Sequence, residues 1–182
     1  MKSSLLCLAA ALGCAALLSA PSSAKIKALT LPQMVDLADD AVAGQITQRE
    51  VFRIDHPVDG PELYYTTLTV QGRSLVNGSE QSVEVIFPGG FIDATNGVFN
   101  SEAPEEHEVA VGKEVVVFHA FTKNMGGEVS GQALLGSHGG LFSVVTNAKN
   151  EKIVLGRGVG FPVSENVRLN VLDDEITLLS KN

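Results

Sequence analysis

Residues Glu114 to Phe121 read EVVVFHAF, and this stretch decides the fold. Side chains of a β-strand point alternately to its two faces, so successive apolar positions make both faces apolar. A strand of this kind lies inside a sheet, with other elements covering it on each side. The stretch therefore predicts a central, doubly covered strand around which the chain is arranged.

Short β-like runs separated by turn residues surround this strand. The most pronounced is LYYTTLTV from Leu63 to Val70, rich in Tyr, Thr and Val. Further strands are expected at residues 42–54, 81–87, 128–135, 140–146 and 153–155. About seven strands with one N-terminal helix are typical of a mainly β protein, and the pattern predicts a small antiparallel barrel or sandwich.

The helix is expected at residues 31–40. Thr30 and Gln33 have the spacing of a capping box, Pro32 lies in the first turn, and apolar residues follow at helical spacing. Residues 93–113 predict an exposed acidic loop. The tail, residues 163–179, combines β-like and short helical features that the sequence does not decide.

The first 24 residues predict a secretory signal. Lys2 precedes an uncharged run from Leu5 to Leu18, and small residues at Ser22 and Ala24 favour cleavage after Ala24. The uncharged run is shorter than the roughly 20 residues that a membrane-spanning helix needs. Two alternatives stay open, a retained anchor and a lipoprotein attached through Cys14.

Cleavage would leave one exported domain, residues 25–182, in the periplasm or the medium and without a membrane span. Both cysteines lie before residue 25, so this domain would depend on its core alone. The 182-residue chain has 13 Lys+Arg and 21 Asp+Glu, and loss of Lys2 moves its net charge from −8 to −9. This balance argues against nucleic acid, whose phosphates require basic residues, and suits anionic lipid poorly.

Several short motifs follow one another along the chain: Leu37-Ala38-Asp39, Val42-Ala43-Gly44-Gln45-Ile46, Tyr64 to Val70, Val83-Glu84-Val85, Pro88-Gly89-Gly90, Val111 to Phe118 and Gly139 to Val144. Their order resembles that of a loosely defined group of exported bacterial β-barrel modules, which are largely uncharacterised. The resemblance spans about 31–146 and implies a small closed barrel similar to the oligonucleotide/oligosaccharide-binding (OB) fold. One departure is Leu75-Val76-Asn77-Gly78, where most such modules carry Lys before the loop glycine. The group has no agreed catalytic residues, so it implies none here.

Candidate chemistry is sparse. The sequence has no G-x-S-x-G, and the adjacent Ser137 and His138 are poorly placed to act on one substrate atom. Zinc would need three or four converging ligands, and calcium would need a set of oxygen donors. The alternative to a zinc site is that His119 is a hydrogen-bonded histidine on a strand, and the alternative to a calcium site is that the acidic residues form a solvated charged loop. The metal-ligand candidates are His119, His138, Asp93, Glu105, Glu106, His107 and Glu108, with Glu102 and His56 as further donors.

Two other features have a structural and a functional interpretation. Tyr64 and Tyr65 are adjacent on a strand, so one would point outward, either to stack on a ligand or to form a cross-strand pair. Gly156-Arg157-Gly158-Val159-Gly160 has some features of a dinucleotide loop, but Phe161-Pro162 follows where a helix should open. A turn or close backbone packing is the expectation there.

The sequence leads to a non-enzymatic exported module that binds a protein, a peptide or an envelope component, with no cofactor. One alternative is a metal-dependent hydrolase using His119, His138 and the acidic-loop carboxylates. Another is an accessory or inhibitor domain for a secreted protease.

Overall fold

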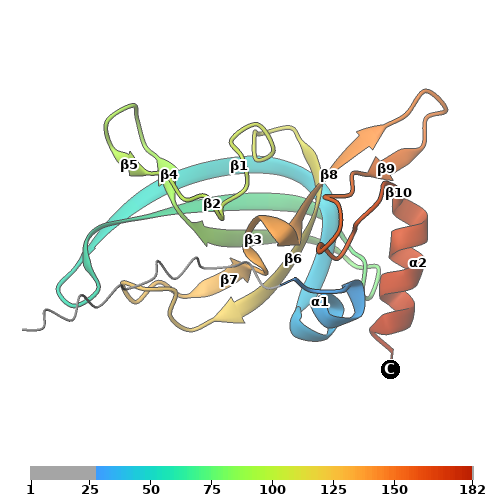
Figure 1. Cartoon of the computed structure of the whole chain (residues 1–182), viewed down its shortest axis with the longest axis horizontal. Helices are drawn as coiled ribbons and strands as arrows, with labels where there is room; N and C mark the ends of the chain where they lie inside the picture. Colours follow the sequence, from blue (N-terminus) through green and yellow to red (C-terminus); the bar gives the residue numbers. More distant parts are fainter. Residues whose placement is uncertain (1–27, 182) are drawn as a thin grey trace, which may run out of the picture.

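The computed structural model describes residues 28–181, so the expected signal and its cleavage site lie outside the described residues. Figure 1 shows a β-barrel that extends on one side into a long two-stranded arm and carries a helix on the other. The mainly β fold expected from the sequence is confirmed.

Five strands close the barrel. β1 (Asp40–His56), β2 (Gly60–Ser74) and β3 (Glu80–Pro88) form an antiparallel meander. β6 (Glu114–Thr122) pairs with β1 and with β7 (Gly131–Leu134), and β7 pairs with β3. The resulting order is β1-β2-β3-β7-β6 and back to β1, which closes a five-stranded barrel. The β3–β7 pairing is parallel, whereas the other pairings of the described strands are antiparallel.

The sheet continues beyond the barrel through β6. β8 (Leu141–Thr146) pairs with the first half of β6, whereas β7 pairs with the second half on the same side of that strand. β9 (Lys152–Val154) and β10 (Val167–Arg168) then follow in order. A 3-10 turn, η1 (Ser137–Gly140), connects β7 to β8. The described chain thus contains ten strands rather than about seven, three of them two residues long.

The helices differ from the sequence expectation in length and number. α1 (Leu31–Leu37) begins with the expected capping box of Thr30 and Gln33. It ends before residue 40 because the Asp39 backbone amide donates to the His119 carbonyl, and the Asp39 carboxylate accepts from the Phe121 amide. The undecided tail forms β10 and a second helix, α2 (Leu169–Leu179). Neither helix in the described part of the chain is long and apolar enough to cross a membrane.

The loop expected at residues 93–113 is only partly exposed. β4 (Gly90–Phe91) and β5 (Gly97–Val98) form a small hairpin at its start. Near its end, Val109 is buried among the side chains that fill the barrel. The loop therefore departs from a solvated segment because it closes one end of the barrel with an apolar residue.

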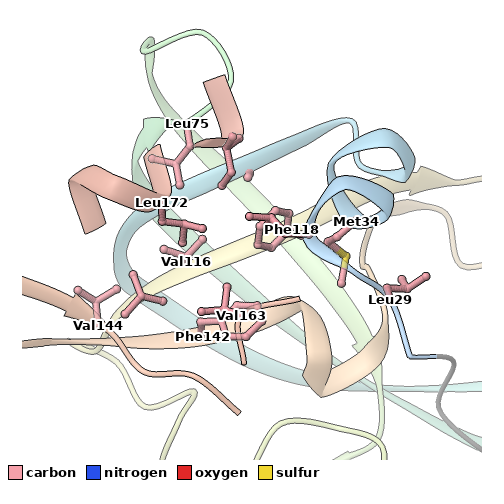
Figure 2. Close-up of a cluster of buried hydrophobic side chains, with 13 residues drawn as sticks. Leu29, Met34, Leu75, Val116, Phe118, Phe142, Val144, Val163 and Leu172 are labelled. Atoms are coloured by element: carbon pink, nitrogen blue, oxygen red, sulfur yellow. The ribbon is translucent and has the colours of Figure 1, made fainter. Parts of the chain in front are cut away.

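Two apolar cores meet at β6. Val115 and Val117 point into the barrel, whereas Val116 and Phe118 point into a second core formed with α1, α2 and β8. Figure 2 shows Phe118, Val116 and Leu172 of α2 in this second core, between the strands and the helices. The prediction of a doubly covered central strand is confirmed.

The barrel also requires two glycines where β1 and β2 cross closely. Gly44 and Gly72 face each other in the β1–β2 register. A Cβ atom at either position would collide with the partner strand's backbone, so neither site accepts a side chain without moving the strands apart. The absence of side chains here lets the long hairpin bend around the barrel.

Two phenylalanines of β6 provide a matched test of the second core. Phe118 is fully buried and makes an edge contact with Phe142 at 6.2 Å between ring centroids, whereas Phe121 is 56% exposed. We expect Phe118→Ala to lower the free energy of unfolding by about 3–5 kcal/mol. Phe121→Ala should change it by less than about 1 kcal/mol. Urea unfolding measures both, and equal effects would contradict the assignment of the core.

Candidate functional site

The β4–β5 hairpin projects from the barrel away from α2, and close backbone contacts fix its base (Figure 1). The chain leaves β3 through Gly89 and Gly90, both at positive φ. Thr66 Oγ1 of β2 donates to the Gly89 carbonyl at 2.6 Å, and Asn100 Nδ2 donates to the Pro88 carbonyl at 2.9 Å. Gly90 packs so closely on Thr66 that a Cβ atom there would collide with its hydroxyl. The hairpin is therefore anchored to the barrel on both of its strands.

The tip of the hairpin is held by Asp93. Its carboxylate accepts from the backbone amides of Thr95 and Asn96 at 2.8 and 2.9 Å, from Thr95 Oγ1 at 2.9 Å and from Asn96 Nδ2 at 2.6 Å. These hydrogen bonds, that of the Asn96 side chain foremost, lower the pKa of the Asp93 carboxyl to about 2. Asp93 thus acts as a turn residue that accepts four hydrogen bonds from within the hairpin tip.

Four large apolar side chains stand out of this rigid frame. Phe91, Ile92, Val98 and Phe99 are 49%, 51%, 44% and 79% exposed. A single exposed apolar residue is ordinary, but a group of them on one braced hairpin makes this surface a candidate contact site.

A cleft of about 450 Å³ lies beneath the hairpin, at the mouth of the barrel. Its apolar walls come from Phe87 and Val109 at the barrel end and from Phe91 and Phe99 of the hairpin segment. Arg49 of β1 lies at the same mouth. Two shallower hollows, of about 420 and 530 Å³, adjoin the hairpin on its other sides. We call the four exposed side chains and this cleft the hairpin surface.

Arg49 is the one basic side chain that lines the cleft among the described residues. Its Nη1 lies 3.0 Å from Glu106 Oε1, and the Glu106 side chain is 83% exposed. The Arg49 Nε atom is buried and has no hydrogen-bond partner in the described chain. The cleft thus presents apolar walls beside one partly satisfied guanidinium.

The acidic-loop candidates are each engaged with a different neighbour. Glu105 lies 3.1 Å from His107, and Glu106 contacts Arg49. Glu108 forms a largely buried ion pair with Arg157 at 2.7 Å, and Arg157 Nε donates to the Leu141 carbonyl. Glu105 and Glu106 line the cleft, and the three carboxylates make no common ligand set in the described part of the chain.

The histidine candidates lie on separate elements. His119 is buried, its Nδ1 hydrogen-bonds to Gln132 Oε1 at 2.9 Å, and its Nε2 has no partner in the described chain. His138 Nδ1 lies 3.1 Å from the Glu102 carbonyl, and its ring packs against Phe161. His56 lies at the end of β1 beside Asp59. Within residues 28–181, no group of three or more His, Cys, Asp or Glu is placed to hold a metal ion.

The outward tyrosine forms a cross-strand pair instead of an open platform. Tyr65 lies opposite Phe52 in the β1–β2 register, with the rings stacked at 5.7 Å. Its hydroxyl donates to the carbonyls of Met125 and Gly126, whose loop covers it. Burial, assisted by the nearby Asp59 charge, raises the pKa of Tyr65. Tyr65 therefore joins the β6–β7 loop to the barrel and is not free to stack on a ligand.

The glycine-rich stretch after β9 packs against its own chain. A Cβ atom on Gly156 would lie 2.5 Å from the Glu165 backbone, so close backbone packing is confirmed as its structural reason. A separate hollow of about 430 Å³ lies between α2 and β9, but each of its charged lining residues is already in an ion pair. Two pairs lie within the lining, Arg73–Asp173 and Arg168–Glu151, and Lys152 pairs with Glu114 outside it.

The hairpin surface was missed by the sequence reasoning, although a signal was present. Phe91-Ile92 and Val98-Phe99 flank the turn residues Asp93 to Gly97. Two apolar pairs on either side of a short turn are the mark of a hairpin. Because acidic residues follow, the composition of residues 93–113 favours a loop over a strand.

In comparisons with protein-family models, curated proteins and solved structures, nothing matches the chain. The resemblance to exported bacterial barrel modules therefore stays a prediction.

The hydrogen bonds of Asp93 lead to a pH-dependent prediction. Because the folded pKa, about 2, lies below the ordinary value of 3.8, the contribution of Asp93 to stability is complete above about pH 4 and is lost as pH falls towards 2. The carboxyl carbon of Asp93, followed by NMR, should titrate with a midpoint near 2. The Ile92 amide donates to the Asn96 carbonyl, so its protection against hydrogen exchange should show the same pH dependence. Asp93→Asn should remove that dependence. A midpoint near 4 would contradict the assignment.

Proposed function

We propose that this chain is an exported, non-enzymatic β-barrel module that binds a protein or peptide of the cell envelope through the hairpin surface. The observation that carries the proposal is the group of four exposed apolar side chains on a braced hairpin above an apolar cleft. When a partner covers apolar area of this kind, the free energy of the system falls, which favours binding.

The rigidity of the hairpin supports binding. Its base is held by Thr66 and Asn100, and its tip by Asp93. A surface that is already in its bound conformation loses little conformational entropy when a partner docks. Aromatic residues such as Phe91 and Phe99 have few rotatable bonds and bury much area, which makes them suitable anchors.

The residues that line the cleft also favour binding over chemistry. Its walls are apolar, and its one basic side chain, Arg49, is paired with Glu106. Such a site supplies contact area and one orienting charge. The narrower alternative, an accessory or inhibitor domain for a secreted protease, is favoured by one observation: the hairpin projects as a braced loop that another protein's groove could receive.

Site-specific photo-crosslinking in the full chain tests the proposal. Benzoylphenylalanine is introduced at Phe91 or Phe99, and as a control at Val159, which is fully exposed but lies outside the hairpin surface. We expect protein adducts from the cell envelope at the two hairpin positions and none at Val159. Adducts of equal yield at Val159 would contradict the proposal.

The recovered partner then serves in a binding measurement with alanine variants. Phe91→Ala and Phe99→Ala should each weaken binding at least about tenfold, which corresponds to about 1.4 kcal/mol. Because Phe99 is largely exposed, its replacement should leave the midpoint of thermal unfolding nearly unchanged. Undiminished binding by the Phe91→Ala/Phe99→Ala double variant would refute the role of the hairpin.

A further inference from the structure

We infer that the partner segment is apolar and flanked by basic residues, so that lysine or arginine side chains meet the acidic rim while apolar side chains enter the cleft. This inference rests on the proposed function and specifies its ligand. It follows from the charges that surround the hairpin surface.

The chain segment that builds the hairpin surface is acidic throughout. From residue 74 to residue 112 there is no Lys or Arg, whereas seven Asp and Glu occur. Glu105 and Glu106 are exposed and line the cleft itself. A like-charged ligand would be repelled from this rim, and a cationic ligand would be steered towards it.

The nearby arginines offset only the carboxylates with which they pair. Arg49 is paired with Glu106 at 3.0 Å. Arg53, further along the same strand, is paired with Asp55 at 2.9 Å and with Glu62 at 3.2 Å. Hydrogen bonding to Asp55 raises the pKa of Arg53, in keeping with this pairing. Arg49 and Arg53 are thus each already matched by at least one carboxylate, and Glu105 remains as further acidic surface.

The apolar part of the ligand is fixed by the dimensions of the hairpin surface. The cleft of about 450 Å³ is bounded by Phe91 and Phe99. One neighbouring hollow shares Phe99 with the cleft, and the other shares Phe91. A segment with two or three large apolar side chains could fill these spaces. The basic residues at its ends would then lie near the rim.

Three capped, fluorescent peptides test the inference with the full chain: KKLFLFKK, SSLFLFSS and EELFLFEE. They share one apolar centre and differ only in flanking charge. At 10 mM salt we expect the lysine peptide to bind about tenfold more tightly than the glutamate peptide, with the serine peptide between them. At 1 M salt the ratio should fall below about twofold, because the screening length drops from about 30 Å to about 3 Å.

Matched variants locate the effect. Glu105→Gln/Glu106→Gln should reduce the lysine-to-glutamate ratio to about threefold or less. Asp174→Asn/Glu175→Gln removes two exposed charges from α2 and should leave the ratio unchanged. Phe91→Ala/Phe99→Ala should weaken binding of all three peptides at least tenfold. The midpoint of thermal unfolding is measured for every variant, so that loss of folding is recognised.

The outcomes separate this inference from the proposed function. Equal binding of the three peptides, lost in Phe91→Ala/Phe99→Ala, would overturn the inference and leave the proposed function standing. Tighter binding of the glutamate peptide would overturn it as well. If no peptide binds, and vesicles of phosphatidylcholine are bound in a Phe99-dependent way, the surface recognises lipid and both proposals fail.

Discussion

Four consecutive side chains of β6 are fully buried, and they point alternately into two cores. Val115 and Val117 help fill the barrel, whereas Val116 and Phe118 pack beneath the helices. A barrel alone would leave Val116 and Phe118 facing water, at a cost of about 1.5–3 kcal/mol for each side chain. The strand that closes the barrel therefore depends on both helices and on the strands after it to bury Val116 and Phe118.

The same constraint explains where the hairpin surface lies. The barrel interior is filled by apolar side chains and closed at its mouth by Val109, so a ligand has no room inside it. The outer face of β2 near Tyr65 is covered by the β6–β7 loop. The β4–β5 hairpin remains uncovered: Thr66 holds its base against the barrel, and Asp93 holds the turn at its tip.

Much of the fold could be predicted because its signals are local. The period-two runs of β1 to β3, the capping box at Thr30 and the apolar run of β6 each depend on neighbours in sequence. The end of α1 could not be predicted, since it depends on Asp39 bonding to a strand 80 residues away. α2 had a usable signal, because Leu169, Leu172, Ile176 and Leu179 lie at helical spacing. Residue type alone identified the histidine and carboxylate candidates. Tertiary contacts, which the sequence does not show, decide that each of them bonds to a different neighbour.

The ion pair between Glu108 and Arg157 joins two parts of the molecule that the sequence presents as unrelated. Glu108 directly precedes Val109, which lines the cleft, and Arg157 lies in the segment after β9, where it also donates to the Leu141 carbonyl. The chain at the barrel mouth is therefore held in part by the C-terminal segment. A fragment cut at residue 146 would keep all five barrel strands, but Glu108 would lose its largely buried partner.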